Sequence, residues 1–285
     1  MMDWLIHKIK LLHPGYQKLI LDYPVKLQPR FGDATGAHSM LDNIIRANSS
    51  QYAEILNCVL EHRATFAGIK EAKDERSAQL PGWNNKFLPG LDIIILYTML
   101  QVYKPATYLE VGSGNSTKVA KLAIRNGSLN TKLISIDPAP RAEIDQLADT
   151  IIRAPFESID FLPYIQDLQA NDILFIDNSH RILPNSDSMV FFLEVLPRLK
   201  PGVIVQIHDI YLPYDYPQFM CDRFYSEQYG LAMYLLANPQ RYKTIMPNFF
   251  VYKTPELLEI LNPIWDLPNM TGVEHHGGSF WIQIQ

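Results

Sequence analysis

Short runs of β-branched and other apolar residues alternate with helix-forming segments from about residue 105 onward. We expect the corresponding strands at residues 107–111, 132–136, 150–153, 172–177 and 203–209. Strands that alternate with helices pair in parallel through right-handed crossovers, and the loops at their carboxyl ends form the ligand crevice. The pattern therefore predicts a doubly wound α/β fold with its functional residues at those strand ends.

The remaining segments complete this architecture. Beyond the fifth strand we expect a helix over 215–236, a broken strand over 242–252, a helix after Pro255 and a last, antiparallel strand over 279–284. Apolar residues at three-to-four spacing between 41 and 60 predict helices, and a buried helix over 92–103 ends before Pro105. We divide the chain into an N-terminal helical cap, residues 1–80, and a Rossmann-like domain, residues 81–285.

Composition narrows the partners and the compartment. The chain has 30 acidic and 25 basic side chains, and a net charge of −5 leaves no basic excess for the phosphates of nucleic acid. Cys58 and Cys221 are too far apart to suggest a zinc cluster or a disulfide framework. Residues 1–10 lack the pattern of a signal peptide, and the longest apolar run, 93–100, falls short of the roughly 20 residues of a membrane helix. We expect a cytoplasmic protein without membrane insertion.

The turn after the first strand has the features of a ligand-binding loop. Glycine permits a sharp turn and a close ligand approach, and the following helix offers free N–H groups. Glu110 would repel a pyrophosphate, and Thr117 occupies a position where a dinucleotide-binding loop needs a small residue. The loop is therefore expected to bind a cationic ligand, through Glu110 and residues Gly112, Ser113, Gly114, Asn115 and Ser116.

The second strand ends in an acid, Asp137, a little over 20 residues past the glycine turn. An acid at this place accepts hydrogen bonds from both ribose hydroxyls of a nucleoside. Asp137 is therefore the expected ribose ligand.

Four strand-end motifs together resemble those of the class I S-adenosylmethionine-dependent methyltransferases. They are Glu110-x-Gly112-x-Gly114-x-Ser116, Ile136-Asp137-Pro138, Phe175-Ile176-Asp177 and Pro201-Gly202-Val203. The resemblance runs from about residue 105 to the C-terminus and implies a seven-stranded sheet whose last strand is antiparallel. It also implies that Glu110, Gly112 and Gly114 hold the methionine end of S-adenosylmethionine. Adenine would lie against Ala154, Phe156 or Glu157, and Asp177 would also face the cofactor.

Two polar clusters follow neighbouring strands, one from Asp177 to His180 and the other around His208 and Asp209. Asp177 and Asp209 are expected about 5 Å apart, the spacing between strands. Carboxylates this close need a shared proton or a cation. Oxygen ligands suit Mg²⁺ or Ca²⁺, and histidine extends the choice to manganese or iron. Asp177 and Asp209 are thus candidate metal ligands, although backbone hydrogen bonds and a helix cap explain them equally well.

More loosely, these strand ends resemble the metal-dependent sugar O-methyltransferases and the cephalosporin-hydroxylase-like group, which hold magnesium with acids at these places. Asp187 and Asp215 are candidate third ligands. Methyl transfer to a hydroxyl also needs a base. We expect His208 to be that base, oriented by Asp209 or Asp177, with His180 as the reserve.

Aromatic residues are expected around the acceptor. The segment 210–217 would wall one side, while Trp83 and Phe87 either close the other side or fill the core. His275 and His276 are expected in an exposed turn.

The sequence thus favours O-methylation of a small hydroxylated acceptor, such as a sugar, a glycan precursor or a natural product. An NAD-dependent oxidoreductase and a non-catalytic nucleoside-binding module are the alternatives. The N-terminal helices suit a lid and a homo-oligomer contact equally well.

Overall fold

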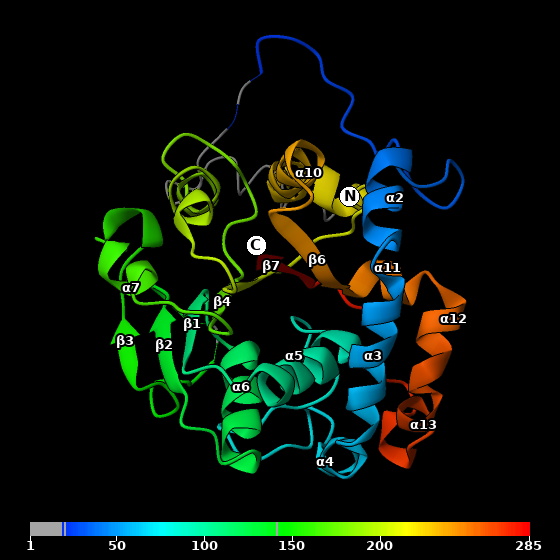
Figure 1. Ribbon diagram of the computed structural model, residues 1–285, viewed down its shortest axis with the longest axis vertical. Helices are drawn as coiled ribbons and strands as arrows, with labels where there is room; N and C mark the ends of the chain where they lie inside the picture. Colours follow the sequence, from blue (N-terminus) through cyan, green and yellow to red (C-terminus); the bar gives the residue numbers. More distant parts are fainter. Residues whose placement is uncertain (1–18, 20, 141) are drawn as a thin grey trace, which may run out of the picture.

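The computed structural model describes residue 19 and residues 21–140 and 142–285, so the expectation for residues 1–10 lies outside the described part. A seven-stranded sheet in the order β3-β2-β1-β4-β5-β7-β6 forms its centre (Figure 1). The strands are β1 (Thr107–Val111), β2 (Lys132–Ile136), β3 (Thr150–Ile152), β4 (Ile173–Ile176), β5 (Ile204–Ile207), β6 (Tyr242–Pro247) and β7 (Phe280–Ile284). Strands β1 to β5 are parallel, and β7 runs antiparallel to both of its neighbours. The predicted α/β class and sheet are confirmed.

Helices cover both faces of this sheet. In Figure 1, α5 and α6 lie below the strands, α10 lies above them, and α2 and α3 run along one side. The α-helices are α2 (Ser39–Arg46), α3 (Ser49–Leu60), α4 (Arg63–Gly68), α5 (Gly90–Tyr103), α6 (Asn115–Asn126), α7 (Leu162–Gln166), α8 (Asp187–Val190), α9 (Gln218–Cys221), α10 (Glu227–Ala237), α11 (Asn248–Tyr252), α12 (Pro255–Leu258) and α13 (Asn262–Trp265). Four short 3-10 helices in the described residues are η1 (Phe156–Ser158), η3 (Leu196–Arg198), η4 (Glu259–Leu261) and η5 (Pro268–Met270). The element η2 (Phe191–Val195) is a short π-helix.

Two predicted elements are shorter than expected. Strand β6 stops at Pro247, which has no N–H to extend a ladder, and the chain continues as α11. The helix expected over 215–236 is divided into α9 and α10, because Phe224 between them has a left-handed backbone with φ +60°.

Helix α5 is central to the core. Ten successive residues after Gly90 are buried on all sides of the helix, and it ends at Lys104, whose left-handed conformation precedes Pro105. The helices α2 and α3 pack into the same hydrophobic core as the sheet, through residues such as Leu41, Ile45 and Leu56. The division of the chain at residue 80 stays a prediction.

Within the described residues, no helix has both the length and the apolar character that crossing a membrane requires.

The strand register positions the site. Val111 pairs with Ile136 and with Ile176, and Ile176 pairs with Ile207. The carboxyl ends of β1, β2, β4 and β5 are therefore level at one edge of the sheet. The residues that follow these strands, which include the predicted site residues, meet at this edge.

Candidate functional site

The glycine loop is fixed against the end of β4. Gly112 has φ +83°, and a Cβ at this position would lie 1.7 Å from the carbonyl oxygen of Asp177. The Gly112 N–H donates to the Ile136 carbonyl at 2.9 Å. Only glycine fits here, because both the backbone conformation and the close approach of the chain exclude a side chain.

Glu110 lies beneath this loop. Its carboxylate is fully buried and accepts hydrogen bonds from Ser116 Oγ, at 3.2 Å, and from Thr117 Oγ1. Thr117 Oγ1 in turn accepts the Gly114 N–H at 3.0 Å, which caps the start of α6. Burial raises the pKa of Glu110 to about 7, against the opposing effect of the hydroxyl hydrogen bonds. Glu110 holds the loop from below, and none of the three cavities described below is lined by it. Its expected contact with a cationic ligand stays a prediction.

A cavity of about 390 Å³ opens beside the loop. Asp137 lines it, and its two oxygens accept the N–H groups of Ser113 and Ala139, each at 2.8 Å. A carboxylate oxygen has two lone pairs, so each oxygen retains one acceptor position. Phe156 and Glu157 also line this cavity, whereas Ala154 does not.

A smaller recess of about 30 Å³ adjoins the first cavity. It is lined by the start of α6 together with a loop from before α5, through Ser113, Gly114, Asn115, Ser116 and Phe87. The loop residues predicted from the sequence are therefore gathered around one continuous region at the sheet edge.

A third cavity, of about 370 Å³, lies on the other side of Asp177. Its lining includes Phe87, Asp177, His180, His208, Asp209, Tyr211, Tyr225 and His276. Asp177 lines both this cavity and the one beside the glycine loop. The two cavities therefore share this residue in their linings.

The aromatic wall differs in part from the expectation. Tyr211 and Phe87 line the third cavity, but Trp83 is fully buried in the core. The expected exposed turn at His275 and His276 is wrong, because both are half-buried. His276 lines the cavity, and His275 stacks on Trp265 at 4.2 Å.

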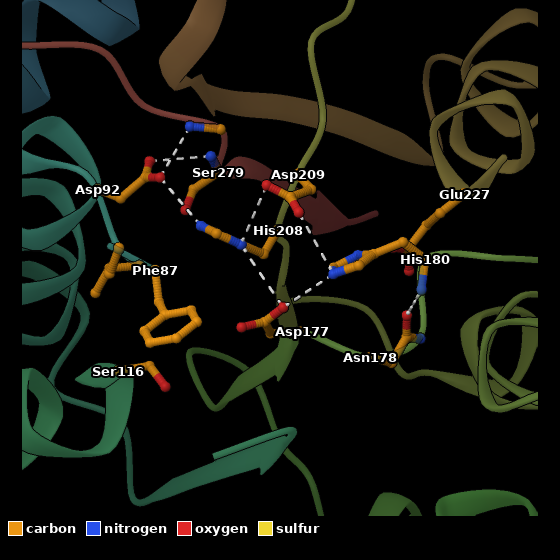
Figure 2. A network of polar contacts seen from close by, with 12 residues as sticks. Phe87, Asp92, Ser116, Asp177, Asn178, His180, His208, Asp209, Glu227 and Ser279 are labelled. Atoms are coloured by element: carbon orange, nitrogen blue, oxygen red, sulfur yellow. Dashed lines mark hydrogen bonds and ion pairs between the residues drawn. The ribbon is translucent and has the colours of Figure 1, made fainter. Parts of the chain in front are cut away.

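His208 connects three acids (Figure 2). Its Nε2 lies 3.2 Å from Asp92 Oδ2, and its Nδ1 lies 3.7 Å from Asp177 Oδ1 and 3.6 Å from Asp209 Oδ1. Burial alone would lower the pKa of His208, but the charges of Asp177 and Asp209 and the hydrogen bond to Asp92 raise that pKa well above 6.5. The acids around His208 thus favour the protonated imidazole, and its expected role as the base stays a prediction.

His180 occupies a matching place on the opposite side of the two aspartates (Figure 2). Its Nδ1 lies 3.0 Å from Glu227 Oε2, and its Nε2 lies 3.4 Å from both Asp177 Oδ1 and Asp209 Oδ2. Burial alone would lower the pKa of His180, and the hydrogen bond with Glu227 raises it overall. The two aspartates are thus held between two imidazoles.

Asp92 and Glu227 are members of this network that the sequence analysis missed. Asp92, in the first turn of α5, is buried and also accepts hydrogen bonds from Asn248 Nδ2 at 2.7 Å and from the N–H groups of Gly278 and Ser279. Glu227 is fully buried at the start of α10. Asp92 could have been found from the sequence, because it is the only acid in the largely apolar α5. No comparable feature of the sequence marks Glu227.

The backbone supports this arrangement with unusual conformations. His180 and Asp209 both have a left-handed backbone, with φ +61° and +55°. Non-glycine residues rarely adopt it, and such residues persist where the surrounding structure fixes them.

The two expected metal ligands, Asp177 and Asp209, both face imidazoles, and their role as metal ligands stays a prediction. In the part of the chain that the structure describes, no group of three or more His, Cys, Asp or Glu side chains is arranged to hold a metal ion. Asp187 accepts hydrogen bonds from Ser179, and Asp215 accepts the N–H groups of Arg30 and Phe31 at 2.6 and 3.1 Å. Both candidate third ligands therefore have hydrogen-bond partners of their own.

The fold and the cavities define an α/β protein with a cavity of about 390 Å³ at the carboxyl ends of its parallel strands. Residues 109–210 match the sequence profile of a family described as a methyltransferase domain. The match agrees with the class I methyltransferase resemblance, and the family implies S-adenosylmethionine as the methyl donor. A comparison with curated proteins gave no match. The looser similarities to metal-dependent sugar O-methyltransferases and to the cephalosporin-hydroxylase-like group are not confirmed.

Proposed function

We propose that the chain transfers a methyl group from S-adenosylmethionine to a hydroxyl oxygen of a small acceptor, such as a sugar, a glycan precursor or a natural product. The observation that carries this proposal is the position of Asp177. This residue lines both the cavity beside the glycine loop and the cavity beyond it. A donor in the first cavity and an acceptor in the second would meet there.

The residues around the first cavity fit the donor. Asp137 has acceptor positions for ribose hydroxyls, and Phe156 offers an apolar ring to adenine. The N-terminus of α6, at Asn115, offers N–H groups to a carboxylate. S-adenosylmethionine would supply a methyl carbon to which the acceptor oxygen bonds, while the carbon–sulfur bond breaks and S-adenosylhomocysteine leaves.

We assign the proton acceptor to Asp177 instead of His208. The side chain of Asp177 is 30 % exposed, whereas that of His208 is 4 % exposed with both ring nitrogens facing acids. As the acceptor oxygen bonds to carbon, its proton passes to the Asp177 carboxylate. His180 connects Asp177 to Glu227 and gives that proton a route away from the reacting atoms. His208, as an imidazolium, holds Asp177 and Asp209 in place by their charge.

The test combines ligand binding with methyl transfer. Calorimetry with S-adenosylmethionine and with NAD identifies the cofactor, and labelled S-adenosylmethionine is then assayed against sugar, phenol and amine acceptors. Asp177→Asn is expected to lower kcat at least about 100-fold, the usual contribution of an acid or base, while binding the donor within a few-fold of the parent. Asp215→Asn is the matched control, because this acid faces backbone N–H groups.

Three results would contradict the proposal. NAD binding without S-adenosylmethionine binding would indicate an oxidoreductase. Donor binding without transfer to any acceptor would indicate a non-catalytic module. Full activity of Asp177→Asn would remove the proton acceptor that we assign.

A further inference from the structure

Basic side chains gather at the mouth of the third cavity. Lys86 and Arg223 line it, and both are exposed. Arg181 lies beside Arg223 and donates from Nε to the Arg223 carbonyl at 2.8 Å. Within the described residues, none of these three side chains forms an ion pair with an acid. The mouth therefore carries uncompensated positive charge, although the whole chain has a net charge of −5.

The two arginines are held on one aromatic ring. The guanidinium carbons of Arg181 and Arg223 lie 5.0 and 5.3 Å from the ring centroid of Tyr225. Arg181 is also fixed by a 2.8 Å hydrogen bond from Nη1 to the Ser179 carbonyl. Tyr225 stacks in turn on His180, with ring centroids 4.8 Å apart. The positions of the two guanidiniums are thus tied to the residues that face Asp177.

Lys86 is also held in a defined place. It has a left-handed backbone, with φ +73°, in a loop that folds around Asn85. The Asn85 side chain accepts the N–H groups of Phe87 and Leu88 and donates to the carbonyls of Gly82 and Leu88. The hydrogen bonds of Asn85 therefore fix the loop backbone that carries Lys86 to the mouth.

The two guanidiniums on the Tyr225 ring repel each other, because both are positively charged and neither pairs with an acid. A bound anion would offset this repulsion. Glu274 also lines this cavity, but it forms no ion pair with Lys86 or Arg223 within the described residues. The two aspartates in the cavity already face imidazoles. The positive charge at the mouth is therefore free to pair with a ligand.

We infer that the acceptor carries an anionic group, a carboxylate or a phosphate, which Arg223, Arg181 and Lys86 bind at the mouth of the third cavity. The hydroxyl of the same molecule then points away from the mouth toward Asp177. This orientation rests on the proposed function, whereas the anion site itself rests on the basic side chains.

Binding is measured first, because it does not depend on turnover. The full chain is titrated with glucose, glucuronate and glucose 6-phosphate by calorimetry or NMR. We expect the two charged ligands to bind at least about 10-fold more tightly than glucose, and the tighter of the two identifies the preferred anion. The double variant Arg181→Gln/Arg223→Gln should lose this preference. Arg198→Gln, in η3 before the amino end of β5 and so at the opposite edge of the sheet, is the matched control and should retain it.

Turnover then separates this inference from the proposed function. With matched neutral and anionic acceptors, the double variant should raise the KM of the anionic acceptor at least about 10-fold and leave kcat and the neutral acceptor nearly unchanged. Equal binding of glucose and the charged ligands, or a double variant that behaves like Arg198→Gln, would overturn the anion site while leaving methyl transfer intact. Anion binding without S-adenosylmethionine binding would instead overturn the proposed function.

Discussion

The two main cavities of this protein are built in different ways. The cavity beside the glycine loop is lined by the last residues of β1 and β2, by the segments that follow β1 to β4 and by Asp187 in α8, all within the segment that matches the methyltransferase domain. The cavity beyond Asp177 combines that segment with parts of the chain on both sides of it, from Lys86 to His276. The comparison teaches that the proposed donor side, beside the glycine loop, is specified by local motifs. The proposed acceptor side, beyond Asp177, depends on how distant segments pack over the sheet.

Gly112→Ala should have the largest effect, and it acts on the donor side. The new Cβ would meet the Asp177 carbonyl at 1.7 Å in a left-handed conformation. We expect loss of S-adenosylmethionine binding and a decrease of about 3 kcal/mol or more in the free energy of unfolding, measured by denaturant titration.

Gly114→Ala is the control for this substitution. Gly114 has an extended backbone with φ 168°, and a Cβ there would have no neighbour within 4 Å. Its free energy of unfolding should stay within about 1 kcal/mol of the parent. Equal stability of the two variants would show that the loop does not press against β4.

Asp92→Asn should have the next largest effect, and it acts on the acceptor side. It leaves the His208 imidazolium without its buried partner on α5, and breaking such a pair costs about 3–5 kcal/mol. NMR titration should show a lower pKa for His208. Glu227→Gln should cost less, because Glu227 Oε1 has no hydrogen-bond partner to lose, and it should lower the pKa of His180 instead. An unchanged pKa of His208 in Asp92→Asn would contradict the network.

The pH dependence of stability should distinguish the two sides. Glu110 and His208 both have a raised folded-state pKa, so the folded protein binds more protons than the unfolded chain and stability falls as the pH rises. The contribution of Glu110 is lost as the pH rises from 4.5, the ordinary pKa of a glutamate, to about 7, and that of His208 is lost above 6.5. Glu110→Gln should flatten the lower part of the curve only. If Glu110→Gln also removed the pH dependence above 6.5, Glu110 and His208 would titrate as a coupled pair.

The smallest effect is expected from a chelator. Because Asp177 and Asp209 already face His180 and His208, methyl transfer should proceed at the same rate after EDTA treatment. Loss of activity that Mg²⁺ restores would show that a metal ion displaces these imidazole contacts.

The sequence was sufficient for the features that depend on neighbouring residues. The parallel strands, the glycine loop and the place of Asp137 follow from local patterns, and the structure places each of them as predicted. The surroundings of His208 could not be predicted in this way. One of the acids that raise its pKa is Asp92, which lies 116 positions away in the chain and reaches the site only through the packing of α5 on the sheet. The same holds for Glu227, which α10 brings to His180.

A crystal structure with S-adenosylhomocysteine would test the central claim most directly. The account predicts adenosine in the cavity of Asp137 and Phe156, with the sulfur directed toward Asp177 and the cavity beyond it. S-adenosylhomocysteine bound in the cavity of His180 and Tyr211, with the cavity beside Gly112 left empty, would contradict the account.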